Sequence, residues 1–227
     1  MKKLFIIFLL FLSPVFIGIS RATSIYSIQH DGVSGSVSIQ GIVIAFDTFN
    51  DTWIADAAGA YNGILISDTD VATSCVVGDL INVSGTAQEY YNMTEIRTVT
   101  SHSIASSGNP PYPATILTCA DLDMNTAADT LPAEQYEGCL VMIQNAKCIM
   151  EQEMTYYEAQ VSDDNGTHIT IIDDDAHSHL LFGMVSGGAY NITGVVQYTY
   201  AQYKLCPRNA ADIVVIATPS FNVWVFY

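Results

Sequence analysis

The stretch VGDLINVSGTAQEYYNMTEI, residues 77–96, decides the fold of this chain, because residues 186–205, SGGAYNITGVVQYTYAQYKL, repeat it without a gap. The offset is 109 residues, and identical residues fall at Gly78/Gly187, Asn82/Asn191, Gly85/Gly194, Gln88/Gln197 and Tyr91/Tyr200. Solenoid repeats have shorter periods, of roughly 20–50 residues. The sequence therefore predicts two tandem copies of one small domain.

Apolar and polar residues alternate through both copies between Gly, Asn and Asp clusters, which is typical of short β-strands. Glycines inside apolar strands, at 41, 85 and 194, favour sharp bends or bulges that close a barrel. Short connecting helices are expected after Thr118 and at 132–136. The predicted strands are 33–45, 52–56, 63–67, 80–89 and 94–101 in the first copy, and 139–150, 156–163, 168–173, 190–198 and 203–206 in the second. Five short strands per copy predict an all-β protein with two small barrels.

The N-terminus has the pattern of a secretory signal peptide. Two lysines precede an apolar run at 4–19, and Ser20 and Ala22 supply the small residues of a cleavage site. A membrane anchor is the alternative, but the run is shorter than the roughly 20 residues needed to span a bilayer and Pro14 interrupts it. We expect export to the periplasm or the extracellular medium, without stable membrane insertion after cleavage. The expected division is signal peptide 1–22, first barrel 23–105, Pro- and Ser-rich linker 106–113, second barrel 114–216 and tail 217–227.

The charge balance is strongly acidic. The chain has 7 Lys and Arg against 23 Asp and Glu, a net charge of −16, and three of the cations precede the expected cleavage site. Nucleic-acid backbones are bound chiefly through Lys and Arg, so the surface as a whole should repel them. Only Arg97, Lys204 and Arg208 are candidates for a small local anion site.

The five cysteines, an odd number for an exported protein, match no metal-binding spacing and include no CxxC. A bridge between Cys148 and Cys206 is one interpretation, because both lie in predicted strands of the second copy. Buried free thiols are the other.

The motifs resemble those of one known family, the OB-fold domains found beside the catalytic domains of bacterial secreted extracellular nucleases. The similar segments are 37–43, 63–66, 77–86, 89–91 and 94–96 in the first copy, and 134–138, 203–205, 207–209 and 212–213 in the second. The resemblance implies two tandem five-stranded OB-like Greek-key barrels, a fold that binds oligonucleotides or oligosaccharides across strands two and three and the adjoining loops. The nuclease catalytic domain is missing, and fold analogy alone supplies no function.

No catalytic residues are expected, since the sequence has no nucleophile elbow and its histidines do not fall in order with Ser and Asp partners. We therefore expect a binding or accessory protein, not an enzyme, and no cofactor. A bound divalent cation is the one exception considered, at Asp173, Asp175, His177 and His179; a solvated turn is the alternative there. Residues 163–166, Asp-Asp-Asn-Gly, favour a tight hairpin over a calcium loop.

Aromatic residues are the candidate ligand contacts. Planar side chains near the expected OB face could stack on bases or sugar rings, with one cation beside them. The alternative is that they fill the barrel ends and shield the contact between the two copies. The candidate partners are an oligosaccharide, a single-stranded nucleic acid or another exported protein. The predicted ligand-binding residues are Trp53, Tyr90, Tyr91, Tyr198, Tyr200 and Lys204.

Overall fold

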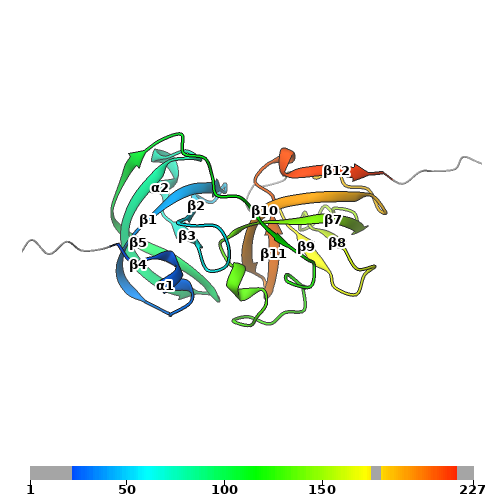
Figure 1. The fold of residues 1–227 in the computed structure, drawn as a ribbon, viewed down its shortest axis with the longest axis horizontal. Coiled ribbons are helices and arrows are strands. Elements are labelled where there is room, and N and C mark those ends of the chain that lie inside the picture. Colours follow the sequence, from blue (N-terminus) through cyan, green and yellow to red (C-terminus); the bar gives the residue numbers. More distant parts are fainter. Residues whose placement is uncertain (1–21, 175–179, 219–227) are drawn as a thin grey trace, which may run out of the picture.

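The computed structural model describes residues 22–174 and 180–218, which form two β-barrels side by side (Figure 1). The first is closed, with strand order β1-β2-β3-β5-β4. β3 and β5 run parallel, and the other neighbouring strands run antiparallel. This is the Greek-key arrangement of an OB barrel. Its elements are β1 (Gly35–Phe46), β2 (Asp51–Ala55), β3 (Gly63–Ser67), the connecting helix α2 (Thr69–Ser74), β4 (Leu80–Tyr90) and β5 (Met93–Ser106).

The second barrel repeats this order as β7-β8-β9-β11-β10 and closes through pairing of β10 with β7. Two further strands, β6 and β12, extend its sheet at the edges. The prediction of an all-β protein with two OB-like barrels is confirmed. The elements of the second half are β6 (Thr115–Leu117), η1 (Glu134–Tyr136), β7 (Leu140–Met150), β8 (Ala159–Ser162), β9 (Thr170–Ile172), β10 (Ala189–Thr199), β11 (Gln202–Cys206), η2 (Ala210–Asp212) and β12 (Ile213–Ala217).

Helices are few and short. α1 (Ile25–Gln29) and α2 were not predicted, whereas the turn of helix expected at 132–136 is confirmed as η1. The helix expected after Thr118 is wrong, because the Asp121 carboxylate accepts hydrogen bonds from the backbone N–H and hydroxyl of Thr118 and closes a turn instead. None of the helices in the described ranges has the length and apolar character needed to cross a membrane.

The repeated glycines have the predicted structural roles. The pairing of β4 with β5 shifts register between Ser84 and Thr86, so Gly85 lies in a bulge. At the equivalent Gly194, a Cβ atom would lie 2.4 Å from the carbonyl oxygen of Cys206. Only glycine permits so close an approach of the two backbones.

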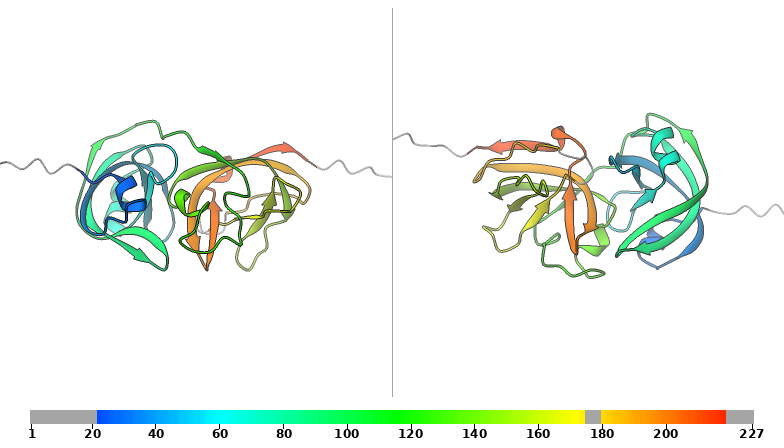
Figure 2. Two further views of the ribbon diagram at one scale, coloured as in Figure 1. Left: turned by 60° about the horizontal axis from the view of Figure 1, so that its bottom comes forward. Right: turned by 180° about the vertical axis from the view of Figure 1, so that it is seen from behind.

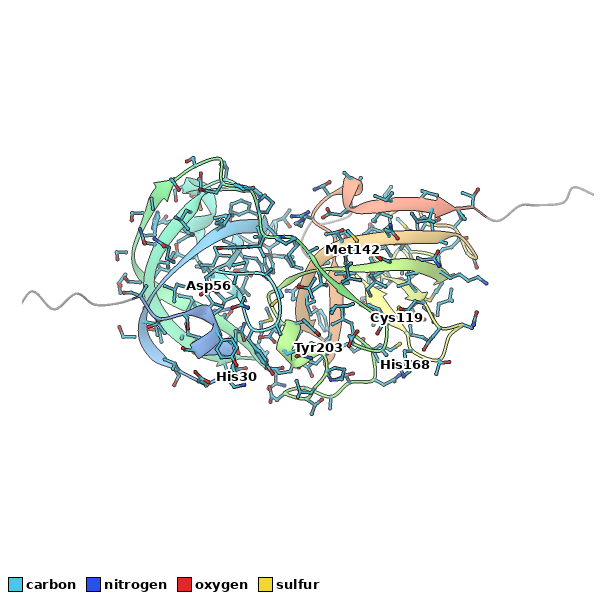
Figure 3. All side chains as sticks on the ribbon, viewed as in Figure 1. His30, Asp56, Cys119, Met142, His168 and Tyr203 are labelled. Carbon is cyan, nitrogen blue, oxygen red and sulfur yellow. The ribbon has the colours of Figure 1, made fainter. Side chains whose placement is uncertain are left out.

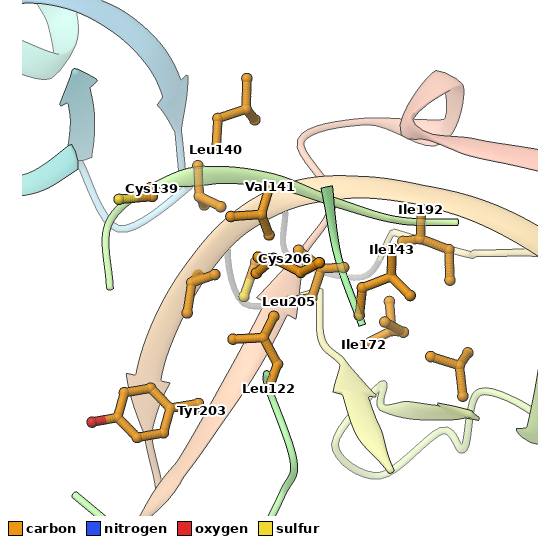
Figure 4. Close-up of a cluster of buried hydrophobic side chains, with 14 of the residues drawn as sticks. Leu122, Cys139, Leu140, Val141, Ile143, Ile172, Ile192, Tyr203, Leu205 and Cys206 are labelled. Atoms are coloured by element: carbon orange, nitrogen blue, oxygen red, sulfur yellow. The ribbon is translucent and has the colours of Figure 1, made fainter. Parts of the chain in front are cut away.

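The core of the second barrel continues into the outer surface of the first. Inside the second barrel, side chains such as Val141, Ile172 and Leu205 pack together (Figure 4). The same cluster includes Trp53 and Leu65 of the first barrel, whose own interior is a separate apolar cluster. The two barrels therefore share one continuous apolar core across their junction.

Backbone contacts make this junction unusually close. A Cβ at Gly63 would lie 2.1 Å from the carbonyl oxygen of Gly138, and the Tyr61 N–H donates to the Gln135 carbonyl oxygen at 2.7 Å. The cavity left between the barrels at this point has a volume of only about 10 Å³. Such packing leaves no room for a side chain at Gly63 or for a ligand between the barrels there.

Glu137 is buried inside the junction. One carboxyl oxygen accepts from the Thr94 N–H at 2.7 Å, while the other is buried and has no hydrogen-bond partner. Burial raises the pKa of Glu137 well above its ordinary value, and nearby Glu134 adds to the rise. The carboxyl group therefore holds its proton at pH values where an exposed glutamate is ionised.

All five cysteines are buried. Cys148 is a free thiol that contacts the carbonyl oxygen of Met150, so the predicted bridge to Cys206 is wrong and the alternative of buried thiols holds for Cys148. Burial raises the pKa of Cys119 to about 12 and that of Cys139 to about 11. These thiols are unreactive because they do not ionise near neutral pH.

Candidate functional site

The ligand face of the first OB barrel is closed. OB barrels bind ligands on the outer face of strands two and three, which are β2 and β3 here. Across this face Trp53 pairs with Leu65, and Leu65 pairs with Glu95 on β5. All three are buried, and Trp53 and Leu65 pack in the cluster that belongs to the second barrel. The second barrel therefore occupies the place of a ligand on the first.

The same row in the second barrel has a different character. Register pairs Gln160 of β8 with Ile171 of β9, and Ile171 with Lys204 of β11. Gln160, which is partly exposed, thus takes the place of the buried Trp53, and Lys204 takes the place of Glu95, with both of these charged residues buried. A pocket of about 490 Å³ opens at this face, lined by Tyr156, Glu158, Asp173, Tyr200, Gln202 and Lys204. We call it the lysine pocket.

Lys204 lies at the floor of the lysine pocket. Its ammonium donates to Glu158 at 2.5 Å and to Asp173 at 2.6 Å, although the side chain is only 2% exposed. Burial lowers the pKa of Lys204, but the two carboxylates raise it by more, so the net shift is upward. The lysine is therefore a fixed cation whose charge is already balanced, and it can donate hydrogen bonds but cannot act as a base.

Tyrosines form the rim. Tyr156 lies in the loop between β7 and β8 and Tyr200 in the turn between β10 and β11, and both are largely exposed. The loop is held in shape by Glu153, whose carboxylate accepts from the N–H groups of Thr155 and Tyr156. A polar floor with aromatic walls suits a ligand that combines ring faces with hydrogen-bonding groups.

Two equivalent hairpins lie beside the pocket. The turn Tyr91-Asn92 joins β4 to β5, and Tyr200-Ala201 joins β10 to β11 at the position that the repeat predicts. All four residues have positive φ, between 49° and 65°. Two-residue turns of this kind favour Asn-Gly, and a bulky tyrosine in this backbone region is uncommon.

A second hollow, which we call the hairpin cleft, separates these turns. It has a volume of about 610 Å³ and is lined by Tyr91, Asn92, Tyr198, Thr199, Tyr200 and Ala201. The backbone N–H of Tyr198 lies 3.5 Å from the sulfur of Met93, which joins the two hairpins at the base. Figure 2 shows the free ends of both hairpins side by side along the lower edge of the molecule. Tyr200 lines both hollows.

The structure places the predicted ligand residues in different surroundings. Tyr91 and Tyr200 are 83% and 86% exposed and face the hairpin cleft, and Lys204 lies in the lysine pocket. Tyr90 is about half-exposed, with Arg97 over its ring at 3.8 Å. The prediction that Trp53 contacts ligand does not fit the structure, because its side chain is fully buried between the barrels.

Tyr198 lines the cleft but is mostly buried. Its ring lies 4.8 Å from that of Tyr203. Tyr203, labelled in Figure 3 near the junction, donates its hydroxyl hydrogen to Glu134 and accepts from the Asp129 N–H. Tyr198 and Tyr203 therefore brace the hairpin.

Of the four predicted metal ligands, only Asp173 lies within the described residues. Asp175, His177 and His179 lie outside the described residues. Asp173 is buried and bound to the Lys204 ammonium. Within residues 22–174 and 180–218, no three metal-ligating side chains gather in one place. Residues 163–166 form a turn between β8 and β9, where Asp164 binds its neighbour His168.

The roles of Glu158 and Asp173 in the lysine pocket could not be predicted from the sequence. Glu158 lies in a predicted strand, and no neighbouring residue in the sequence indicates that its carboxylate pairs with a lysine 46 residues away. Asp173 is a candidate metal ligand from the sequence, with a solvated turn as the alternative, because a run of aspartates gives no sign that a lysine from another strand will reach it. Asn92 could have been found, since it shares the repeated turn with Tyr91.

Comparisons with known proteins add little. No family model and no curated protein matches the chain. Similar solved structures include a murine DNA-binding protein bound with double-stranded DNA, with a TM-score of 0.39 and 11% identity over 83% of this chain and 100% of that one. The p204 HINb domain has a TM-score of 0.37 and 12% identity over 76% of this chain and 93% of that one. The hypothetical protein ygiW from E. coli has a TM-score of 0.31 and 17% identity over 37% of this chain and 90% of that one. Similarities this low do not indicate a function for this chain.

Proposed function

We propose that this chain is an exported, non-catalytic binding protein in which the first barrel is a support and the second barrel carries the ligand site. The observation that carries the proposal is the contrast between the two OB faces. Trp53 and Leu65 are buried on the first face, whereas Lys204 lines an open pocket on the second.

The lysine pocket has the features of a specific small-ligand site. Its volume of about 490 Å³ lies within the range of roughly 300–1,000 Å³ that is usual for ligand pockets. Lys204, Glu158 and Asp173 hold one another in place, so hydrogen-bonding groups are already oriented before a ligand arrives. Pre-oriented groups lower the entropic cost of binding.

Binding of single-stranded nucleic acid, as an accessory region of an extracellular nuclease system, is the second candidate. Exposed tyrosines and the resemblance to nuclease-associated OB domains favour it. The cations oppose it, because Arg97 is paired with Glu95, Lys204 with two carboxylates and Arg208 with Asp212. A phosphate chain would have to displace these carboxylates.

The test is an NMR titration of the full chain without its leader. The probes are neutral hexasaccharides of glucose, xylose and N-acetylglucosamine, the oligonucleotide dT12 and an acidic peptide. We expect one probe class to shift the amide signals of residues 156–160 and 200–204, and Tyr156→Ala to weaken that binding. Phe49→Ala, at an exposed ring on the first barrel, is the matched control and should have no effect. Shifts centred on β2 and β3, or binding indifferent to Tyr156→Ala, would contradict the proposal.

Export and lack of catalysis have separate tests. N-terminal sequencing of the protein recovered from the producing cells should begin at Thr23, as cleavage after Ala22 requires. Purified protein incubated with DNA and Mg²⁺ should leave the DNA intact. A retained leader would argue against export, and cleavage of DNA that a change at one Asp or His abolishes would argue against a non-catalytic role.

A further inference from the structure

We infer that the hairpin cleft is a subsite for a sugar ring of a neutral oligosaccharide, and that the sugar chain crosses from the second barrel to the first past Tyr200. This inference rests on the proposed function of the lysine pocket and adds a ligand class and a contribution from the first barrel. Its decisive residue, Tyr91, belongs to the first barrel and takes no part in the lysine pocket.

The cleft is built from both copies of the repeat. Tyr91 comes from the first copy and Tyr200 is its equivalent in the second, so two tyrosines at aligned positions line one hollow of about 610 Å³. Tyr200 also lines the lysine pocket, which makes the two hollows neighbours. A ligand longer than one ring can occupy both.

The backbone conformation of both turns is unfavourable for tyrosine. Tyr91 and Tyr200 have φ values of 52° and 49°, in the left-handed region that favours Gly or Asn. Neither side chain gains burial in return, since both are more than four-fifths exposed. Their other contacts are limited: the Tyr91 ring packs edge-on against Tyr90, with centroids 4.6 Å apart, and the Lys204 ammonium lies 5.3 Å from the centre of the Tyr200 ring. A bulky residue that stays mostly exposed in a strained turn is a sign of function.

The absence of charged side chains from the lining of the hairpin cleft favours a neutral ligand. The lining of the hairpin cleft contains no Asp, Glu, Lys, Arg or His side chain; it offers tyrosine rings, the Asn92 amide and the Thr199 hydroxyl. The chain as a whole has a net charge of −16, which repels polyanions. Neutral sugars present apolar C–H faces to aromatic rings and hydroxyls to amides and carboxylates, so they match both the cleft and the Lys204, Glu158 and Asp173 floor.

The experiment compares Tyr91→Asn and Tyr200→Asn with the unaltered chain. Asparagine suits the turn, so the melting temperature of both variants should stay the same or rise. Affinity for the best neutral hexasaccharide of the panel, measured by calorimetry, should fall about tenfold in Tyr91→Asn, equivalent to about 1.4 kcal/mol of binding free energy. A larger fall is expected in Tyr200→Asn, since Tyr200 borders both hollows. The trisaccharide of the same sugar should bind more weakly than the hexasaccharide and should be less sensitive to Tyr91→Asn.

The outcomes separate this inference from the proposed function. If Tyr156→Ala weakens hexasaccharide binding but Tyr91→Asn does not, the lysine pocket stands and the hairpin cleft is not a subsite. If dT12 binds through Tyr156 and no hexasaccharide binds at millimolar concentration, the site exists but the ligand class is wrong. If none of the probes binds, both proposals fail. Loss of hexasaccharide affinity in Tyr91→Asn with an unchanged melting temperature supports the inference.

Discussion

The two barrels have the same topology, yet the outer row at strands two, three and five reads Trp53, Leu65 and Glu95 in one and Gln160, Ile171 and Lys204 in the other. In the first row, Trp53 and Leu65 are buried against the partner barrel. The polar row adjoins a pocket. In the function that we propose, one copy of the duplicated fold is a support and the second copy binds the ligand. Variants at the junction test the buried face of the first barrel, and a variant at Lys204 tests the polar face of the second.

Trp53→Ala should cause the largest loss of stability. The indole is fully buried between the barrels, and removing a buried aromatic side chain costs about 3–5 kcal/mol of unfolding free energy. Urea denaturation measures the loss. Phe49→Ala is the control, because that ring is 67% exposed and its removal should cost less than about 0.5 kcal/mol. Equal effects of the two changes would mean that Trp53 is not part of the junction.

Lys204→Met tests the polar row. It leaves Glu158 and Asp173 without their cation, and breaking a buried ion pair costs roughly 3–5 kcal/mol. The two carboxylates raise the pKa of Lys204, so the stability that its ammonium contributes is present at pH 7 and is lost only as the pH rises through that raised pKa. The matched control Lys147→Met, at an exposed lysine of β7, should be nearly silent at every pH. A loss independent of pH would point to lost packing instead of a lost charge.

Gly63→Ala tests the closeness of the junction. The added methyl group would meet the Gly138 carbonyl oxygen at 2.1 Å, so the barrels must separate or distort, at a cost of about 3 kcal/mol. Gly32→Ala is the control: it has φ of 68° and nothing within 4 Å, and should cost about 1 kcal/mol from the backbone alone. Similar costs for both would show that the barrels do not meet at Gly63.

Glu137→Gln should stabilise the protein, by an amount that grows with pH. The raised pKa means that the folded protein keeps a proton that the unfolded chain loses above about pH 4.5, the ordinary value. Stability of the unaltered chain therefore falls as the pH rises from this value toward the folded pKa, by at most about 1.4 kcal/mol per pH unit. Glutamine is neutral throughout, so the variant should match the parent near pH 4 and exceed it at pH 7. A variant less stable at pH 7 would contradict the buried, protonated carboxyl.

Much of the fold could be predicted from the sequence, because it depends on local patterns. Alternation predicted the strands of both barrels, and the aligned repeat predicted that the two barrels share one strand order. β12 was missed because its exposed Val214, Val215 and Ile216 do not alternate with polar residues.

The site was only partly predictable. Tyrosines near expected turns can be identified in the sequence, but no sequence feature distinguishes Trp53 from Tyr200 as a ligand contact. Which of them meets a ligand depends on how one barrel docks on the other, and no local pattern encodes this. The pairing of Lys204 with Glu158 and Asp173 likewise depends on β8, β9 and β11 meeting in space.

Acrylamide quenching of Trp53 fluorescence tests the central claim most directly. Trp224→Phe leaves Trp53 as the single tryptophan of the chain. Since the second barrel covers the indole completely, quenching in the folded protein should be a small fraction of that in urea, and saturating hexasaccharide should leave both the emission and the quenching unchanged. Quenching of the folded protein close to that of the unfolded chain, or protection that appears only with ligand, would mean that the face of the first barrel is open and would contradict the account.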